Sequence, residues 1–162
     1  MKFAKKEFSF YWKIIQIPVY ILVLWSLAGL FTAKYALDSY LKVFGSPWAA
    51  AIGIAVYAIV GYLAVADHKF NIKLAAWAGA LTGIISAFIG AIIGIILLTW
   101  VPEITENAVQ QAIEQGAPEE IIRGFMTIGA YVQLVLGPLF SGLLAAGVAA
   151  IGGLIAKKVE GK

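Results

Sequence analysis

Four long stretches without a charged residue constrain this sequence more than any other feature. They contain 20, 24, 29 and 33 residues, and they lie between Lys13 and Lys34, Lys42 and Asp67, Lys73 and Glu103, and Arg123 and Lys157. A helix needs about 20 apolar residues to cross the hydrocarbon core of a bilayer, and a charged side chain near its centre costs about 3 kcal/mol. The stretches therefore predict four transmembrane helices.

The composition supports this interpretation. The 162 residues are 62% hydrophobic and 13% charged, whereas an average soluble domain is about half apolar and about a quarter charged. The chain has no cysteine and one histidine, which excludes disulfide frameworks, cysteine-based zinc sites and cysteine-linked haem. We expect an all-α, polytopic integral membrane protein in which residues 1–162 form one four-helix transmembrane domain. The predicted spans cover roughly residues 14–36, 47–66, 73–101 and 124–156.

Local patterns predict the bounds of the second span and the nature of the first. Ser46 before Pro47 is the pattern of an N-cap followed by proline at the first helical position, so the second span is predicted to run from Pro47 to Ala66. The basic N-terminus and the apolar stretch after it would also suit a signal peptide. The 20 charge-free residues of that stretch exceed the roughly 7 to 15 of a signal-peptide core, which favours a membrane span.

The segment 102–123 is the largest polar part of the chain. Pro102 and Pro118 each precede two glutamates, a pattern typical of a helix start because acidic residues in the first turn interact favourably with the helix dipole. Gly116 lies between the two starts and predicts the end of the first helix. We expect a helix, a sharp turn and a second helix that continues into the fourth span.

Lysine and arginine residues predict the orientation, because short cytoplasmic loops of membrane proteins are enriched in them. Nine of the twelve fall on the side of the two termini and of the loop between the second and third spans. The other side has only Lys34, Lys42 and Arg123, together with six acidic residues. We expect a multi-pass protein of the cell membrane with cytoplasmic N- and C-termini and with the segment 102–123 outside.

Small residues recur on one face of the third span and on one face of the fourth. Lipid tails are as apolar as leucine, so membrane helices associate where small residues let their backbones approach closely. The third span contains two GxxxG matches. We predict that the two stripes pack against each other within the chain; the alternative is a homo-oligomer interface. The stripes consist of Gly79, Gly83, Ser86, Gly90 and Gly94, and of Gly137, Ser141, Ala145, Ala149 and Gly152.

Bulky residues dominate the first span, and we expect it at the periphery of the bundle. Trp25 is interpreted as a packing or lipid-facing residue; the alternative is that it lines a functional site. Pro138 lies near the middle of the last charge-free stretch, directly after Gly137. A proline inside a helix removes one backbone hydrogen bond and predicts a kink. The pair Gly137 and Pro138 is interpreted either as a structural kink or as a hinge that gates a pathway.

The predicted spans have no ionisable side chain well inside them, which disfavours proton pumps, ion-coupled carriers and voltage sensors. Their neutral polar groups are interpreted as hydrogen-bonding groups between or within helices; the alternative is the polar lining of a pathway. These groups belong to Thr82, Ser86, Gln133 and Ser141. No calcium-loop spacing, Walker loop, GxSxG elbow or HExxH pair occurs. We expect no enzymatic activity, no cofactor, no metal site and no nucleic-acid partner.

The run from Glu114 to Ile121, EQGAPEEI, is followed by a long span that ends in Ala156, Lys157 and Lys158. This part of the chain, at most the C-terminal 60 residues, resembles a family of small bacterial and archaeal four-span membrane proteins classed as a domain of unknown function. The resemblance implies an integral four-helix protein in which a polar helix-turn-helix joins the third and fourth spans, and it implies no known activity.

Two hypotheses about function follow from the sequence. The first is a small non-enzymatic integral membrane protein, either an accessory subunit of a larger membrane complex or a self-associating scaffold, with membrane lipid and further protein copies as partners. The second is a homo-oligomeric channel or facilitator for a neutral or weakly polar solute. Glycine-rich helix faces without any catalytic constellation favour the first, and the Pro138 kink favours the second.

Overall fold

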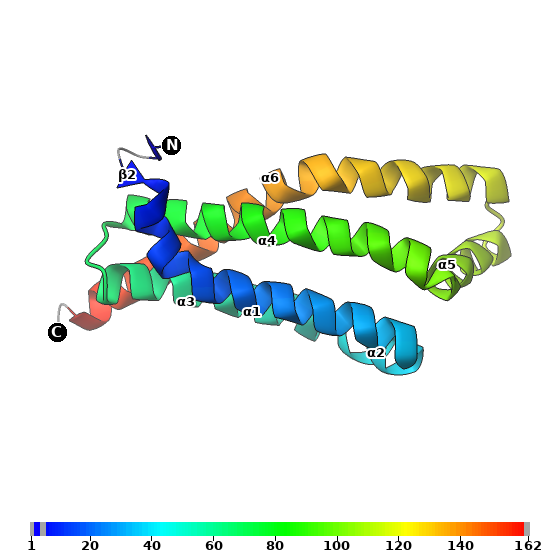
Figure 1. The fold of residues 1–162 in the computed structure, drawn as a ribbon, viewed down its shortest axis with the longest axis horizontal. Helices are drawn as coiled ribbons and strands as arrows, with labels where there is room; N and C mark the ends of the chain where they lie inside the picture. The colour runs from blue at the N-terminus through cyan, green and yellow to red at the C-terminus, as the bar shows by residue number, and fades with distance from the viewer. Residues whose placement is uncertain (1, 4–5, 161–162) are drawn as a thin grey trace.

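The computed structural model describes residues 2–3 and 6–160, which are almost entirely helical (Figure 1). Two-residue strands at the N-terminus, β1 and β2, pair antiparallel. Among the described residues, four helices are long and apolar enough to cross a membrane: α1, α3, α4 and α6. This confirms the predicted all-α class and the four spans. The elements are β1 (Lys2–Phe3), β2 (Lys6–Glu7), α1 (Phe8–Tyr35), α2 (Leu37–Val43), α3 (Pro47–Ala66), α4 (Ile72–Trp100), α5 (Pro102–Glu114) and α6 (Glu119–Glu160).

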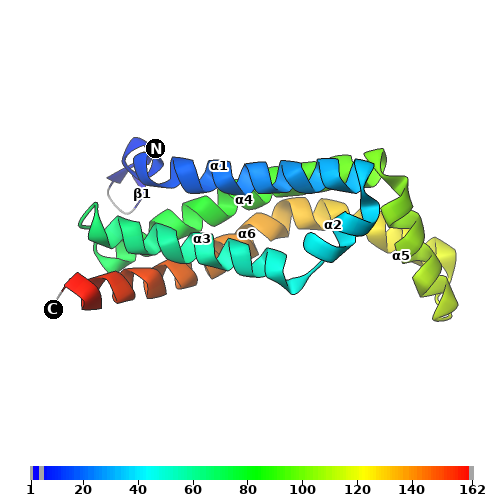
Figure 2. The ribbon, with the colours of Figure 1, turned by 90° about the horizontal axis from the view of Figure 1, so that it is seen from below.

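The four long helices run side by side, so the molecule has two distinct ends (Figures 1 and 2). One end holds both strands β1 and β2, the α3–α4 loop and the end of α6, and seven described lysines lie there; we call it the basic end. They are Lys2, Lys6, Lys13, Lys69, Lys73, Lys157 and Lys158. The opposite end holds α2, α5 and the start of α6, with six acidic residues; we call it the acidic end. Lys5 and Lys162, which the sequence assigns to the side of the termini, lie outside the described residues.

Helix α6 packs extensively against both α4 and α3, and α4 packs against all three of the other long helices. The small residues of α6 allow the backbones to approach closely. A Cβ atom added to Gly79 of α4 would lie 2.5 Å from the Ala145 carbonyl oxygen of α6, and one added to Gly61 of α3 would overlap the Ala149 backbone. Gly152 of α6 faces Ala58 of α3. The small-residue stripe of α6 therefore packs against both α3 and α4, whereas the sequence predicted packing against the third span, α4, alone.

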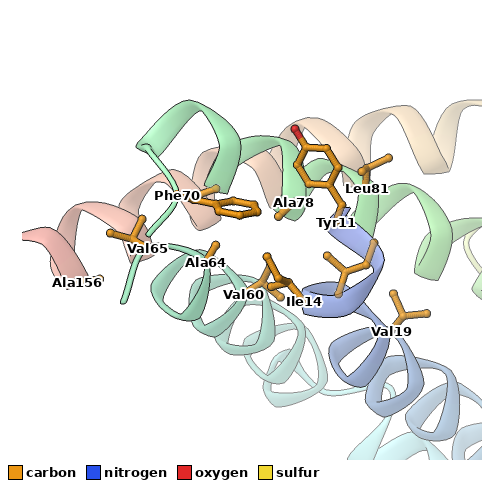
Figure 3. Close-up of a cluster of buried hydrophobic side chains, with 12 residues drawn as sticks. Tyr11, Ile14, Val19, Val60, Ala64, Val65, Phe70, Ala78, Leu81 and Ala156 are labelled. Atoms are coloured by element: carbon orange, nitrogen blue, oxygen red, sulfur yellow. The ribbon is translucent and has the colours of Figure 1, made fainter. Parts of the chain in front are cut away.

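Helix α1 contributes four large side chains to the main hydrophobic cluster (Figure 3). Tyr11 and Ile15 are fully buried, at 0% exposure, against Val60 of α3 and Ala78 of α4. The expectation that the first span is peripheral is wrong for this half of the helix. The physical reason is complementarity of size, since bulky α1 side chains fill the space beside small residues of α3 and α4.

Proline and glycine mark the helix ends as predicted. Helix α3 begins at Pro47 and ends at Ala66. The Ser46 hydroxyl, however, does not cap α3; it donates a hydrogen bond of 2.7 Å to the Val43 carbonyl oxygen. Gly116 has a φ of 87° and ends α5, with its N–H donating to the Ile113 carbonyl oxygen at 2.8 Å. The chain then turns and enters α6, which is continuous with the fourth span as expected.

Candidate functional site

A cavity of about 620 Å³ opens between the helices in the half of the bundle nearer the acidic end. We call it the interhelical cavity. Helices α1, α3, α4 and α6 border it, and Tyr40 of α2 and Ile104 of α5 lie at its rim. Its size falls in the range of about 300 to 1,000 Å³ that is typical of small-molecule sites.

The cavity exists because the small-residue stripes meet over only part of their length. Gly79 and Gly83 pack tightly against α6, but an added Cβ atom at Gly90 would meet only the Ser26 hydroxyl oxygen, at 4.0 Å, and one at Gly94 would meet nothing within 4 Å. Helix α6 changes direction in its orange stretch, which contains Gly137 and Pro138 (Figure 1). The prediction of one continuous packed stripe is therefore wrong for its second half, where Gly90, Gly94 and Gly137 line open space.

Three hydroxyl groups from three helices form a hydrogen-bonded chain at this cavity. The Tyr57 hydroxyl oxygen lies 3.3 Å from Ser141 Oγ and 3.4 Å from Ser86 Oγ. Ser86 donates its proton to the Thr82 carbonyl oxygen at 2.7 Å, so it accepts from Tyr57, and Ser141 in turn donates to Tyr57. Both contacts of Tyr57 exceed the usual 2.7 to 2.8 Å for hydroxyl pairs. The Tyr57 hydroxyl thus makes only long contacts with the two serines, and all three side chains line the cavity.

The structure assigns different positions to the polar residues singled out in the sequence. Ser86, Gln133 and Ser141 line the cavity. Thr82 does not: it is 0% exposed, and its hydroxyl donates 2.9 Å to the Ala78 carbonyl oxygen, as the interpretation of a hydrogen bond within the helix predicts; the alternative of a lining role does not hold for it. Thr82 shares a helix face with Ser86 but lies one turn nearer the basic end, where the helices pack closely. Gln133 extends over Gly137 of the same helix, with its amide nitrogen 2.7 Å from an added Cβ position there.

Aromatic residues contribute to the cavity more than the sequence indicated. Trp25 lines it and contacts Phe44 in a tilted arrangement, with ring centroids 4.6 Å apart, whereas the sequence favoured a packing or lipid-facing role over a lining one. Tyr57 was not recognised at all. Its position near the middle of an apolar span could have identified it. A phenol hydroxyl buried in a membrane needs a hydrogen-bond partner, so such a tyrosine indicates polar groups on neighbouring helices.

The cavity is electrically neutral. None of the described residues that line it is an aspartate, glutamate, lysine, arginine or histidine. Its polar atoms are hydroxyl and amide groups, and its walls are aromatic rings and small or aliphatic side chains. Burying an unpaired charge among such groups is expensive, whereas a neutral molecule with one or two hydrogen-bonding atoms can be satisfied. The arrangement therefore suits an uncharged, weakly polar guest.

An ion pair joins the two helices at the acidic end. Arg123 of α6 donates two hydrogen bonds to the Glu106 carboxylate of α5, at 3.0 and 2.9 Å, and a third to Glu119 at 2.8 Å. These hydrogen bonds and the positive charge of Arg123 lower the pKa of Glu106 below its usual value. The two carboxylates are thus engaged by an arginine, and the described residues contain no group of three His, Cys, Asp or Glu side chains that could hold a metal ion.

Comparisons of the chain with models of known protein families, with curated proteins and with solved structures find no match.

Proposed function

We propose that the protein is a non-enzymatic integral membrane protein, an accessory subunit or scaffold, that holds a neutral, weakly polar molecule in the interhelical cavity. The hydroxyl chain of Ser86, Tyr57 and Ser141 beside a neutral cavity supports this proposal most directly. Membrane-embedded polar groups at a cavity otherwise built of apolar residues are typical of binding sites.

Close packing in the other half of the bundle supports binding rather than an open pore. Toward the basic end, Gly61 and Gly79 bring α3 and α4 against the α6 backbone at Ala145 and Ala149, and both alanines are 0% exposed. A guest that enters the cavity between the helices therefore meets a packed barrier before the basic end.

Filling the cavity tests the proposal. Gly90→Leu should place an isobutyl group in the cavity, where an added Cβ meets only the Ser26 hydroxyl oxygen, at 4.0 Å. Gly147→Leu on α6 is the matched control, because an added Cβ there meets no atom within 4 Å and Gly147 does not line the cavity. Indole and benzyl alcohol are suitable neutral probes, with benzoate and benzylamine as charged analogues. We expect the neutral probes to raise the thermal midpoint of the wild type and of Gly147→Leu in nanodiscs, and to have no effect on Gly90→Leu. Equal responses from all three proteins, or from charged and neutral probes, contradict the proposal.

A second candidate, a facilitator for neutral solutes, is favoured by the change of direction of α6 near Pro138. Movement of the part of α6 before Pro138 against α4 would change access to the cavity. Liposomes with confirmed insertion should then leak small neutral solutes, and Pro138→Ala should change the rate. Absence of flux for a broad panel of neutral solutes rejects this candidate and leaves the binding proposal standing.

Measurements of association with other copies or with partner proteins test the scaffold role. Crosslinking in mild detergent should give either a defined homo-oligomer or a stoichiometric partner, because membrane helices associate through faces with small residues. A strictly monomeric protein without any partner contradicts an accessory or scaffold role.

A further inference from the structure

Three lysines from three segments line one pocket at the basic end, and we call it the lysine pocket. Lys69 lies in the α3–α4 loop, Lys73 in the first turn of α4 and Lys157 in the last turns of α6. The pocket measures about 600 Å³, and Val65 and Phe70 form part of its apolar wall. Lys73 and Lys157 place two positive charges at this pocket, and such charges favour an anion between them.

Three helix ends meet at this pocket. Helix α3 ends at Ala66, and the chain leaves it through Lys69, which has a φ of 54° and whose N–H donates to the Val65 carbonyl oxygen at 3.2 Å. Helix α4 begins shortly afterwards, with the Asn71 side chain accepting a hydrogen bond of 2.9 Å from the Leu74 N–H. The positive dipole end of α4 thus lies beside the negative ends of α3 and α6, so the positive charge of the pocket comes from its lysine side chains and not from the backbone.

Lys73 also borders a second cavity, of about 520 Å³, which we call the α4–α6 groove. The α4 side of the groove follows one helix face from Lys73 through Ala76, Trp77 and Ala80. Its α6 side is formed by Gly142, Leu143 and Ala146. Apart from Lys73, its lining consists of apolar residues and of Trp77, whose amphipathic ring suits the membrane interface. A cationic pocket thus leads into an apolar groove that follows the helix axes toward the membrane interior.

We propose that this combined site binds an anionic glycerophospholipid, with the phosphate held by Lys73 and Lys157 and one acyl chain in the α4–α6 groove. Basic pockets between transmembrane helices recognise anionic headgroups by charge, at about 1 kcal/mol per lysine. The groove distinguishes a lipid from a soluble phosphate, because only a lipid has a tail to fill it. The site is separate from the interhelical cavity, so this proposal is independent of the proposed function.

A charge-matched pair of variants tests the headgroup site. The purified protein in mild detergent is titrated with phosphatidylglycerol or with phosphatidylcholine of the same acyl chains, and bound lipid is counted by native mass spectrometry. Lys73→Gln with Lys157→Gln should weaken phosphatidylglycerol binding roughly 30-fold, the factor for two lysines. The control, Lys13→Gln with Lys158→Gln, removes two basic-end charges that do not line the pocket and should change binding less than 3-fold. Equal losses in both variants, or equal binding of both lipids, overturn the proposal.

A second pair of variants tests whether the α4–α6 groove binds the acyl chain. Ala146→Phe should obstruct the α4–α6 groove and weaken phosphatidylglycerol binding, whereas Ala55→Phe, at an exposed position on α3, should not. If Ala146→Phe fails to fold, Leu143→Gln is an alternative, because Leu143 is 73% exposed and its replacement places an amide in the groove. Glycerol 3-phosphate has the headgroup chemistry without the tail, and we expect it to bind far more weakly. If it binds as tightly as the lipid, or if the groove variants bind lipid like the wild type, the site recognises phosphate only and the lipid assignment is wrong.

Discussion

At the scale of single residues, Tyr57 connects three helices through one hydroxyl group. The sequence predicted the serines on both sides of it as polar groups of the third and fourth spans, and both line the cavity. It did not predict the tyrosine, and for Thr82 it left open a lining role that the structure does not show. Serine and threonine in helices often donate to the carbonyl four residues earlier, as Thr82 does to Ala78. Sequence spacing therefore identifies a polar face without showing which of its members meet the cavity.

Removing the Tyr57 hydroxyl should lower stability modestly. Tyr57→Phe leaves Ser141 without an acceptor and Ser86 without a donor, and it should lower the free energy of unfolding by about 1 kcal/mol, since membrane hydrogen bonds contribute little more than this. Tyr62→Phe, on the exposed face of the same helix, is the control and should leave it unchanged. Unfolding in mixed micelles with increasing SDS measures both. A Tyr57→Phe protein as stable as the control contradicts the hydroxyl chain.

One added methyl group should lower stability in the packed half of the α4 stripe and leave it unchanged in the open half. Gly79→Ala would force a Cβ atom against the Ala145 carbonyl oxygen, at 2.5 Å, and against the Ala149 side chain. Overpacking of this kind costs about 1 to 3 kcal/mol. Gly94→Ala adds the same group to open space and should change stability by less than about 0.5 kcal/mol. The same unfolding assay applies, and equal destabilisation by both substitutions would mean that the stripe is packed along its whole length.

At the scale of elements, helices with clear start and stop signals were predictable and short ones were not. Pro47, Pro102 and Gly116 mark helix ends in the structure as in the sequence. Helix α2 was missed, because seven residues containing Asp38 and Lys42 show no apolar periodicity.

Contacts between elements far apart in the chain were not predictable either. The Lys34 ammonium group at the end of α1 donates a hydrogen bond of 2.9 Å to the Trp100 carbonyl oxygen and so caps the end of α4.

The α5–α6 ion pair should make the position of α5 depend on pH. The pKa of Glu106 is lowered from its usual 4.5 by Arg123, so its ionised form stabilises the docked helix. That contribution is fully present above the usual pKa and is lost as the pH falls through the lowered value. A spin label at Gln111→Cys should therefore become more mobile between pH 6 and pH 3.

Variants of α5 distinguish this ion pair from general acid effects. Glu106→Gln should show the mobile label already at pH 6 and little further change on acidification. Glu114→Gln, at the other end of the same helix, should behave like the wild type. A pH response that persists in Glu106→Gln would assign the transition to another group.

At the scale of the whole molecule, charge separates toward the two ends of the bundle, as the sequence pattern indicated (Figure 2). The sequence could not show which helix faces meet, because lipid-facing and packed surfaces are equally apolar. The shared position of α6 between α3 and α4, and its divergence near Pro138, depend on the sizes of side chains on three helices at once.

Cysteine labelling tests the predicted orientation of these two ends. The wild type has no cysteine, so single substitutions give a clear signal. In intact cells, Gln111→Cys at the acidic end should react with a membrane-impermeant maleimide, and His68→Cys should react only after permeabilisation. His68 is preferable to Asn71 for this purpose, because the Asn71 side chain caps α4. The reverse pattern overturns the orientation, and labelling of both sites in intact cells contradicts four spans.

Helix α6 is one uninterrupted helix that borders both proposed binding sites. Gln133 lies at the interhelical cavity and Lys157 at the lysine pocket, separated by about 36 Å of helix at 1.5 Å per residue. A guest that displaces the cavity side of α6 thereby acts on a body that also holds the lipid phosphate. Thermodynamic linkage makes such an effect reciprocal: the factor by which the guest changes lipid affinity equals the factor by which the lipid changes guest affinity. If both proposals hold, we expect a lipid bound at the basic end to change the affinity of the interhelical cavity for its guest.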